Sequence, residues 1–419
     1  MREMKDSGVE WIGKIPNSWA SDKVKYHFSN TKRIVGTKVN EYQRLALTLK
    51  GVIKRSKDDN EGLQPSEFRG YQILKNGELV FKLIDLQNTA TSRVGLSSYT
   101  GIVSPAYIVL NGKDSIVPSF AEKYFLSMWY RNIFNHLGDS GVRSNLNAQE
   151  LLNVSIAYPN IMEQHKIADF LDQKCSEIDA LTADIQTQIE TLEEYKKSVI
   201  TEAVTKGLDP NVEMKDSGAK WLGAIPSSWK VNKLKFSLRR NDIRKAGQHT
   251  VLSLYREFGV IPKDSRDDNH NVTSEDTSKY KFVRKGDFVI NKMKAWQGSV
   301  GVSKYEGIVS PAYYVYNFIN NDINKDYFHY LMRSNYKHEF RRLSGGIREG
   351  QWDLPSDALD NTVIIIPPLE EQRQIADFLD QKCSEIDQTI YEKQQQLETL
   401  AEYKKSLIYE YVTGKKEVA

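Results

Sequence analysis

The chain has 419 residues, of which 40% are hydrophobic and 27% charged, a composition typical of globular proteins that excludes a fibrous or disordered chain. No apolar run reaches the ~20 residues of a membrane helix, and the start contains no secretory apolar segment, so we expect a cytoplasmic protein without membrane contact. The two cysteines, Cys175 and Cys383, form no CxxC pair and are expected to be reduced thiols on helices.

The sequence contains two copies of one unit. The thirteen residues IADFLDQKCSEID occur identically at 167–179 and 375–387, and GIVSPAY occurs at 101–107 and 307–313. A period near 208 residues is far longer than that of a solenoid repeat. The repeat therefore indicates duplication of a whole domain together with the segment that follows it, and it implies internal pseudo-symmetry.

The net charge follows the same repeat. It is +6 for residues 1–160, −5 for 161–206, +6 for 207–368 and −4 for 369–419. The two basic blocks favour a polyanionic partner, whereas the acidic segments should avoid one.

Each copy begins with a mixed block. Short β-prone runs predict strands at Leu45–Leu49, Leu79–Ile84, Ile102–Leu110, Phe288–Lys292 and Ile308–Tyr316. Apolar residues then take helical spacing, and each block ends in a further strand, Val154–Tyr158 or Val363–Ile366, before prolines that mark the entry to a helix. We therefore expect two α+β domains.

The segments that follow these domains are predicted to be long helices, from about 162 to 206 and from about 370 to 412. Gly207 stands where a C-terminal cap glycine belongs. The first helix has a coiled-coil seam at Ile178, Leu181, Ile185, Gln188, Leu192, Tyr195 and Val199, and the second has the corresponding seam through Ile386, Thr389, Lys393, Gln396, Leu400, Tyr403 and Leu407. Because each repeat ends in a helix and the next begins beside that end, the helices should pack antiparallel, with the chain termini close together.

The sequence contains no recognisable catalytic motif. A phosphate-binding GxxxxGK[ST] loop, GxGxxG after a strand, HExxH, GxSxG and the Asn/Asp-Pro-Pro-aromatic motif of amino-methyltransferases are all missing, and the seven His have no ligand spacing. Four repeated tryptophans, at positions 11, 19, 221 and 229, are interpreted as core or docking residues rather than base stackers.

The basic blocks supply candidate DNA contacts. Arg143 and Arg348 each follow Gly in a loop and recur in both copies, which suits contact with a guanine edge or a phosphate, although a structural salt bridge is an equal alternative. Lys292, Lys294 and Trp296 are expected on one face of a strand. The full candidate set is Lys32, Arg33, Lys54, Arg55, Lys57, Lys82, Arg93, Arg143, Arg239, Arg240, Lys292, Lys294, Trp296, Arg341, Arg342 and Arg348.

The order of these motifs resembles a known family. A variable domain ends in a strand and in Pro-Pro-Leu-Glu-Glu-Gln (367–372; degenerate at 159–164), continues as Ile-Ala-Asp-Phe-Leu-Asp…Ile-Asp and closes on Glu-Ala-Val-Thr-Lys-Gly (202–207), and the whole unit is doubled. This resembles the DNA-specificity subunit of type I restriction–modification systems. The resemblance implies two target recognition domains, 1–160 and 209–368, and two conserved helices, 161–208 and 369–419, that form an antiparallel pair.

The resemblance also implies which partners the chain binds and which tasks the partner subunits carry out. The chain would read a bipartite asymmetric site on double-stranded DNA and hold two methyltransferase subunits and, through them, two restriction subunits. It would bind no metal or cofactor, because S-adenosylmethionine, ATP and Mg are used by partner subunits. The identical segments would be docking surfaces, with contacts at Ile167, Phe170, Leu171, Asp172, Ile178, Asp179, Ile375, Phe378, Leu379, Asp380, Ile386 and Asp387.

Two other functions stay open at this point. One is a coiled-coil regulator that binds DNA alone, and the other, less favoured, is a nuclease or methyltransferase with degenerate motifs. A duplicated enzyme should repeat its catalytic residues, and no acidic or Asn-Pro-Pro set repeats.

Overall fold

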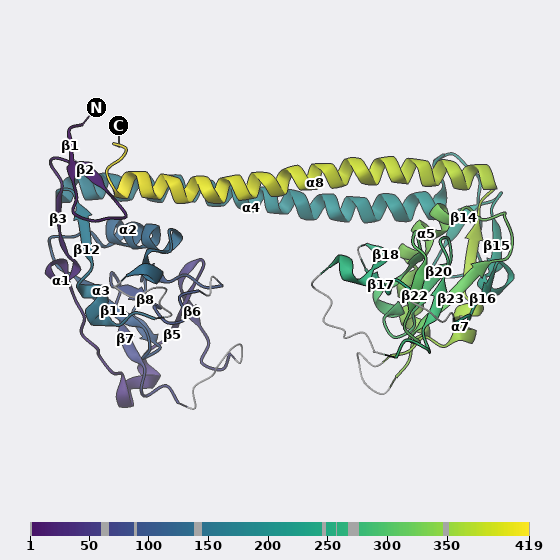
Figure 1. Cartoon of the computed structure of the whole chain (residues 1–419), viewed down its shortest axis with the longest axis horizontal. Coiled ribbons are helices and arrows are strands. Elements are labelled where there is room, and N and C mark those ends of the chain that lie inside the picture. Colours follow the sequence, from purple (N-terminus) through teal and green to yellow (C-terminus); the bar gives the residue numbers. More distant parts are fainter. Residues whose placement is uncertain are drawn as a thin grey trace. The chain divides into compact units, whose positions relative to one another are not determined.

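The computed structural model describes residues 2–59, 67–87, 90–137, 145–244, 249–256, 258–266, 276–346 and 352–418. The chain forms two compact units (Figure 1). Unit 1 consists of residues 1–185 and 394–419, and unit 2 of residues 186–393. The division passes through both long helices, so each unit contains one mixed domain and part of each helix. The four segments expected from the sequence remain a prediction.

Unit 1 begins with the mixed domain, whose elements in chain order are β1 (Met4–Asp6), β2 (Lys14–Pro16), β3 (Ala20–Lys23), α1 (Val24–His27), β4 (Phe28–Ser29), η1 (Gly36–Glu41), β5 (Arg44–Thr48), β6 (Gly51–Arg55), β7 (Gln72–Leu74), β8 (Leu79–Phe81), β9 (Val94–Leu96), β10 (Gly101–Val103), β11 (Ile108–Gly112), α2 (Pro118–Tyr130), η2 (Ile133–His136), α3 (Ala148–Leu152) and β12 (Ser155–Tyr158). One four-stranded sheet has the order β6-β5-β10-β7 and the other β4-β11-β8-β9. The second sheet packs against α2 through Phe81 and Phe125, whose rings are 5.0 Å apart.

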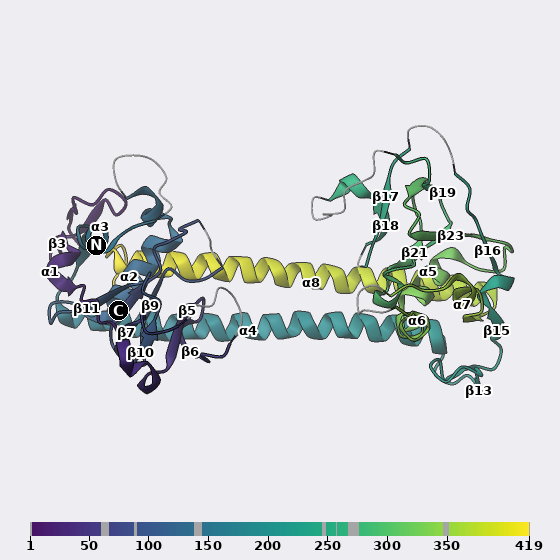
Figure 2. The same ribbon diagram turned by 90° about the horizontal axis from the view of Figure 1, so that it is seen from below.

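Unit 2 repeats this plan with β13 (Met214–Asp216), β14 (Ala224–Pro226), β15 (Lys230–Lys233), η3 (Leu234–Phe236), β16 (Leu238–Arg240), β17 (Leu252–Tyr255), β18 (Gly259–Pro262), η4 (Lys263–Ser265), β19 (Lys281–Val283), β20 (Phe288–Asn291), η5 (Ala295–Gln297), β21 (Val300–Val302), β22 (Gly307–Val309), β23 (Tyr313–Phe318), α5 (Lys325–Arg333), α6 (Tyr336–Leu343), α7 (Ser356–Asp360) and β24 (Val363–Ile366). Its sheet β16-β23-β20-β21 corresponds to β4-β11-β8-β9 and packs against α5 (Figure 2). The strand pairs β17–β18 and β19–β22 are linked by a parallel bridge between Val251 and Ile308.

The repeated GIVSPAY segment has a structural explanation. An added Cβ would lie 2.4 Å from the carbonyl oxygen of Gln43 at Gly101, and 2.3 Å from that of Thr250 at Gly307. Each glycine therefore permits close approach of two strands. The predicted single strands through these segments are wrong, because each breaks at Ser-Pro-Ala into two strands, β10 and β11 or β22 and β23.

The long helices α4 (Ile161–Lys206) and α8 (Leu369–Val412) form as predicted. In unit 1 the ring of Phe170 lies 4.5 Å from that of Tyr411. Farther along α4, Asp179 is 2.6 Å from Lys404. Residue numbers thus rise along one helix while they fall along the other, so the helices are antiparallel (Figure 1).

The same arrangement holds within unit 2. Lys196 of α4 contacts Asp387 of α8 at 2.6 Å, and Lys393 donates a hydrogen bond to Gln188 at 2.5 Å. The helix α4 ends at Lys206, and Gly207 follows with φ +80°, which confirms the predicted cap.

The predicted seam is only partly right. Ile178 and Ile185 are buried, but Leu181 and Tyr195 are 48% and 49% exposed. Ile189 is buried instead, and Thr182 is half-buried with its hydroxyl bonded to the carbonyl of Ile178. On α8, Tyr403 is 55% exposed. The buried positions therefore agree with the predicted seam at Ile178 and Ile185 and lie one residue farther along α4 at Thr182 and Ile189.

Two of the four repeated tryptophans, Trp19 and Trp229, are core residues. Trp19 and Trp229 are 1% and 0% exposed, and their indole nitrogens donate to Glu163 at 3.2 Å and to Glu371 at 3.0 Å. The neighbouring Gln164 and Gln372 are fully buried. The interpretation of these tryptophans as core residues is confirmed, and the Glu-Gln pair at each helix start anchors the helix to its domain.

The chain termini meet within unit 1 (Figure 1). Arg2 contacts Glu417 at 2.6 Å, and the Lys415 ammonium donates to the carbonyl of Ile12 at 2.9 Å. The predicted proximity of the two ends is confirmed.

Candidate DNA interface and docking surface

The two repeated loop arginines, Arg143 and Arg348, lie outside the described residues. The described residues beside them show a shared anchor. The amide of Leu146 donates to the carbonyl of Leu83 at 2.8 Å, and the amide of Leu354 donates to that of Lys292 at 3.0 Å. Both units therefore attach the same position of the chain to the end of the same strand.

Several predicted DNA contacts are held by acidic side chains of their own domain. Arg33 is paired with the buried Glu78. Arg55 contacts Asp59 at 2.6 Å. The side chain of Lys57, by contrast, donates to the carbonyl of Val39 at 2.6 Å. These contacts hold the three cationic side chains at the surface of unit 1. A DNA phosphate would have to displace the present partner of each side chain in order to bind it.

Arg93 belongs to the interior of unit 1, and Lys82 beside it is half-buried. Arg93 is 0% exposed and donates to the carbonyl of Asp85 at 2.6 Å, while Lys82 donates to the hydroxyl of Thr91 at 3.2 Å. Burial lowers the pKa of both, and the charge of Arg93 lowers the pKa of Lys82 further. The surface role predicted for Arg93 is therefore wrong. Its buried side chain instead holds together the part of the chain between β8 and β9.

The predicted strand face in unit 2 is also wrong. The strand β20 ends at Asn291, whose side chain accepts from the amide of Met293 at 3.1 Å and turns the chain. Lys292 then pairs with Asp353 at 2.9 Å, whereas Lys294 is exposed and Trp296 lies in η5. An asparagine-initiated turn, which the alternation of side chains did not reveal, separates the three residues.

The remaining candidates are exposed. Lys54 lies over the ring of Tyr99 at 4.8 Å, and Arg240 lies over that of Tyr314 at 4.7 Å and contacts Asp242 at 3.0 Å. Lys32 and Arg239 are exposed as well. Arg342 is held by two hydrogen bonds of 2.7 Å to Glu339, while the adjacent Arg341 lies near two tryptophan rings.

Sequence reasoning missed one of these rings, that of Trp352. It lies 5.5 Å from the ring of Trp296. The two residues are 56 positions apart in the sequence, so no local pattern connects them. The sequence offered one signal for this pair. Trp296 and Trp352 have no tryptophan counterpart in the first copy, whereas the core tryptophans recur in both copies.

Half of the predicted partner contacts are core residues. Ile167, Leu171, Ile178, Ile375, Leu379 and Ile386 are at most 8% exposed. Their burial assigns these side chains to the packing of the helices against the domains or against each other. The predicted docking role therefore falls to the other six, Phe170, Asp172, Asp179, Phe378, Asp380 and Asp387.

The two copies of this surface are not alike. Asp172 contacts Lys123 of α2 at 2.7 Å, whereas Asp380 accepts from the hydroxyl of Tyr330 on α5 at 2.6 Å. Although burial alone lowers it, the carboxylates of Glu122 and Asp172 raise the pKa of Lys123. Each aspartate thus fastens the helix to its domain through a different partner.

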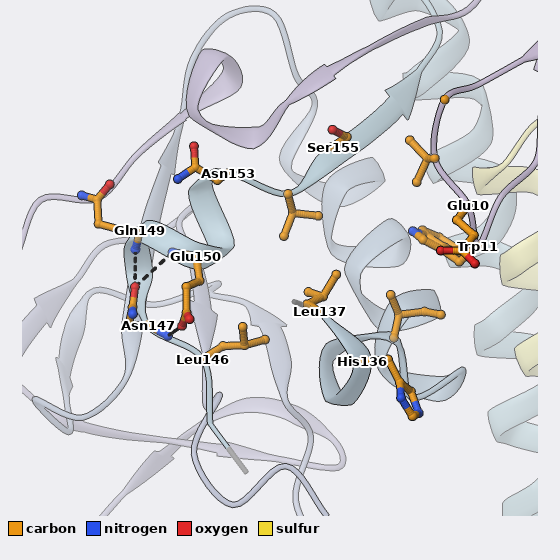
Figure 3. Close-up of a pocket in the computed structure, with 14 residues that line it drawn as sticks. Glu10, Trp11, His136, Leu137, Leu146, Asn147, Gln149, Glu150, Asn153 and Ser155 are labelled. Carbon is orange, nitrogen blue, oxygen red and sulfur yellow. Dashed lines mark hydrogen bonds between the residues drawn. The ribbon is translucent and has the colours of Figure 1, made fainter. Parts of the chain in front are cut away.

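A cavity of about 900 Å³ lies between the N-terminal segment and α3 in unit 1 (Figure 3). Its walls include Trp11, Ile133 and Leu137, and its rim includes Glu150, which is held by the amide of Asn147 at 2.9 Å in a helix cap. In unit 2, where Trp221 is the counterpart of Trp11, the ring of Tyr336 lies 4.6 Å from it. In unit 1 the ring of Tyr124 lies 5.5 Å from that of Trp11.

No described residues form a group of three or more His, Cys, Asp or Glu that could hold a metal ion. Among the helices in the described parts of the chain, none is long and apolar enough to cross a membrane.

Comparisons with known proteins agree on one family. The type I restriction modification DNA specificity domain matches residues 51–191 and 239–399, once in each copy. The specificity subunit of the type I restriction enzyme MjaVIII of Methanocaldococcus jannaschii is 27% identical over 364 residues, which are 82% of this chain and 80% of the relative.

Two solved structures share the fold. A chain from a study of complex assembly and conformational transition of the type I R-M system aligns with a TM-score of 0.70 at 14% identity, covering 96% of this chain and 99% of that one. The HsdS subunit from Thermoanaerobacter tengcongensis aligns with a TM-score of 0.52 at 14% identity, covering 96% and 98%. The α+β class with two domains and long helices is therefore confirmed. With the specificity domain matched in both halves, this chain belongs to the family of type I restriction–modification DNA specificity subunits, which recognise DNA and are not themselves catalytic.

Proposed function

We propose that this chain reads a bipartite, asymmetric target on double-stranded DNA, with one half-site for each recognition domain and unread base pairs between them. Phosphate contacts would supply most of the affinity, and side chains at base edges would supply discrimination. S-adenosylmethionine, ATP and Mg would be bound by partner subunits and not by this chain.

The observation that carries the proposal is the contrast between a shared backbone anchor and the different side chains beside it. Both domains hold Leu146 or Leu354 by the same backbone hydrogen bond. Around this shared anchor, unit 1 has the apolar Leu83, whereas unit 2 has the Lys292–Asp353 pair and two tryptophans. A common frame with different side chains is what two half-sites of different sequence require.

We also propose that the helix surface holds two methyltransferase subunits and, through them, two restriction subunits. The acidic residues that the two copies share are excluded from DNA contact by their charge, so a protein partner suits them better. Phe378 is 40% exposed, whereas its counterpart Phe170 stacks on Tyr411. The two docking surfaces would therefore share their charges and differ in this apolar contact.

The DNA-reading proposal is tested by a methylation-site map of the complex formed with the methyltransferase of the same host. Arg143→Ala should relax or weaken recognition of one half-site only, and Arg348→Ala of the other half-site only. The expected cost is about 1–3 kcal/mol where the contact is a bidentate pair with guanine. A change in the same half-site for both variants would refute the assignment of one domain to one half-site.

A regulator that binds DNA alone is the second candidate, favoured only by the basic domains. Capture of a methyltransferase from the native cell on the tagged full chain supports the specificity-subunit proposal. Sequence-specific DNA binding with no methyltransferase captured supports the regulator.

A further inference from the structure

A cleft of about 690 Å³ lies in unit 2, where α4 ends and the chain leads to β13 (Figure 2). Its wall combines the last turns of α4, residues of the segment 207–214 and one residue of α8, and all of them belong to the described part of unit 2. Four apolar side chains of this wall are between 39% and 49% exposed, namely Tyr195, Leu208, Met214 and Phe378. The cleft is therefore an open apolar surface.

Unit 1 shows what occupies the same place in the first copy of the helix pair. The recurring EYKKS segment aligns Ala203 of α4 with Tyr411 of α8, and the identical thirteen-residue segment aligns Phe378 with Phe170. In unit 1 the ring of Tyr411 lies 4.5 Å from that of Phe170 and is tilted by 38° against it. Unit 2 keeps the phenylalanine, but opposite it has only the methyl group of Ala203, which lines the cleft.

The absent ring leaves apolar surface uncovered in unit 2. In unit 1, Phe170 is half-buried and Leu407 is buried. In unit 2, Phe378 is exposed, and Val199, which aligns with Leu407, is only half-buried. Both substitutions reduce volume in the same direction, so unit 2 lacks a phenol ring and a methylene group at this place.

The frame around the cleft is otherwise alike in the two copies. Residues 375–387 are identical to 167–179, and the ion pair that joins the two helices recurs at 2.6 Å in both units. A ring that enters from outside can therefore pack on Phe378 in the way that Tyr411 packs on Phe170. Aromatic pairs at such distances are favourable beyond the area that they bury.

The charged side chains of the cleft favour an uncharged occupant. Glu202 and Lys206, one turn apart on α4, form an ion pair at 3.9 Å. The carboxylate of Asp209 accepts from the amide of Asn211 at 2.9 Å. Burial of apolar area is therefore the main gain that an occupant can make here.

We propose that this cleft takes an aromatic side chain of the methyltransferase subunit that docks on unit 2, in the place that Tyr411 occupies in unit 1. The inference deepens the proposed docking of methyltransferase subunits and rests on it. The cleft is continuous with that docking surface, because Phe378 belongs to the repeated segment that also carries Asp380 and Asp387. A second copy of this chain has no such link to the cleft.

The proposal makes the two docking surfaces unequal. Two copies of one methyltransferase subunit present the same side chain to both surfaces, but in unit 1 the ring of Tyr411 already packs on Phe170. Only the subunit on unit 2 gains the burial of its ring. The surface of unit 2 is therefore the tighter one.

The test titrates the full chain with the purified methyltransferase subunit of the same host and follows the bound subunits by native mass spectrometry. The wild type should bind two subunits in two steps. Their dissociation constants should differ by about 10- to 100-fold beyond the statistical ratio of two equal sites, which corresponds to the burial of one aromatic side chain.

Ala203→Tyr places the chain's own ring in the cleft. It should weaken the tighter step by about 10- to 100-fold and leave the other step unchanged. Its midpoint of thermal unfolding should equal or exceed that of the wild type, because the ring packs as Tyr411 does in unit 1. The control Gln186→Tyr adds the same ring at an exposed position of α4 outside the cleft and should keep both steps.

A second pair of variants removes the ring that receives the partner. Phe378→Ala should weaken the tighter step with little change in thermal unfolding, because this ring is already 40% exposed. Phe170→Ala is its matched control in the other copy and should leave the tighter step unchanged. This pair decides the question if Ala203→Tyr does not fold.

Two equal steps in the wild type would overturn the inference, and so would a tighter step that survives Phe378→Ala and a folded Ala203→Tyr. An equal loss in Gln186→Tyr would overturn it as well, because the effect would not depend on the cleft. Self-association of the chain without methyltransferase that Ala203→Tyr abolishes would assign the cleft to a second copy instead. A wild type that binds no methyltransferase would overturn the proposed docking itself, and this outcome is seen before any variant is measured.

Discussion

The carboxylate of Asp179 lies 2.6 Å from the ammonium of Lys404, and the repeat places Asp387 at the same distance from Lys196. Each pair joins the last residue of the identical thirteen-residue segment to the EYKKS segment of the other helix. The two pairs are related by the duplication, one in each unit. The identity of the repeated segments is thus explained in part by the packing of the helices on each other.

Reversal of one of these charges should be repaired by reversal of its partner. Asp179→Lys alone places two ammonium groups together and should lower the free energy of unfolding of the full chain by about 1 kcal/mol, because the pair is partly exposed and screened by water. The double variant Asp179→Lys, Lys404→Asp should recover most of this loss. Urea unfolding at low and high salt measures both, and a double variant no better than the single one would show that the contact does not couple the helices.

Partner binding should depend on the exposed acids of the helices. Glu177 is half-exposed and contacts Lys174 at 2.7 Å and Gln173 at 2.9 Å on its own helix, so Glu177→Lys should leave the fold intact. We expect it to remove one methyltransferase subunit from the complex, and Glu385→Lys to remove the other. The mass of the assembled complex measures this. Glu190→Lys, a control on the same helix outside the repeated segment, should retain both subunits, and equal loss in the control would refute the docking surface.

Alanine at the repeated glycines should unfold the domain that contains it. At Gly101 and Gly307 a Cβ would lie 2.4 and 2.3 Å from a backbone carbonyl oxygen, which cannot move without breaking the sheet. Each substitution should cost about 3 kcal/mol or more. Gly70→Ala is the control, because no atom lies within 4 Å of its added Cβ. The midpoints of thermal unfolding of the three variants measure this. A Gly307→Ala variant as stable as Gly70→Ala would contradict the close approach of the two strands at Gly307.

The stability of unit 2 should fall in acid because of His329. Its Nδ1 accepts from the amide of Val302 at 3.1 Å, and burial, with the charges of Arg333 and Lys304, lowers the pKa of His329 to about 3. Because the folded pKa lies below the unfolded one, the neutral form stabilises the fold above about pH 6.5, and this contribution is lost as the pH falls toward 3.

Between pH 6.5 and 4 the loss attributable to His329 should be about 2–3 kcal/mol. His329→Asn keeps an acceptor for the amide of Val302 and cannot titrate, so its unfolding free energy should vary less with pH over this range. Parallel urea titrations of the two proteins measure the difference, and identical pH profiles would show that His329 is accessible to protons in the folded state.

A circular permutant should retain the fold. Arg2 and Glu417 are in contact, so a short linker can join the ends, and the new termini open near Asp209 and Pro210. We expect the permutant to unfold with the midpoint of the wild type and to assemble with the methyltransferase. Loss of complex formation by a stably folded permutant would argue that the chain ends themselves take part in docking.

The sequence by itself determined the duplication, the α+β class, both long helices with the cap at Gly207, and the family. These features depend on local signals, such as the absence of Pro and Gly over each helix and the exact recurrence of motifs, which are present before the chain folds. The core role of Trp19 and Trp229 also followed from their recurrence, because a residue needed by the same frame is kept in both copies.

Only the tertiary structure decided which side chains are available to a partner. The sequence could not reveal that Arg342 is bound by Glu339, that Arg93 is buried or that Lys292 is bound by Asp353. It placed the helix seam on Leu181 and Tyr195, whereas the packed helices bury Thr182 and Ile189 at least in part. Charge and spacing show what a residue can do, but the groups that surround it after folding, far away in the sequence, determine whether its charge is already neutralised or faces solvent.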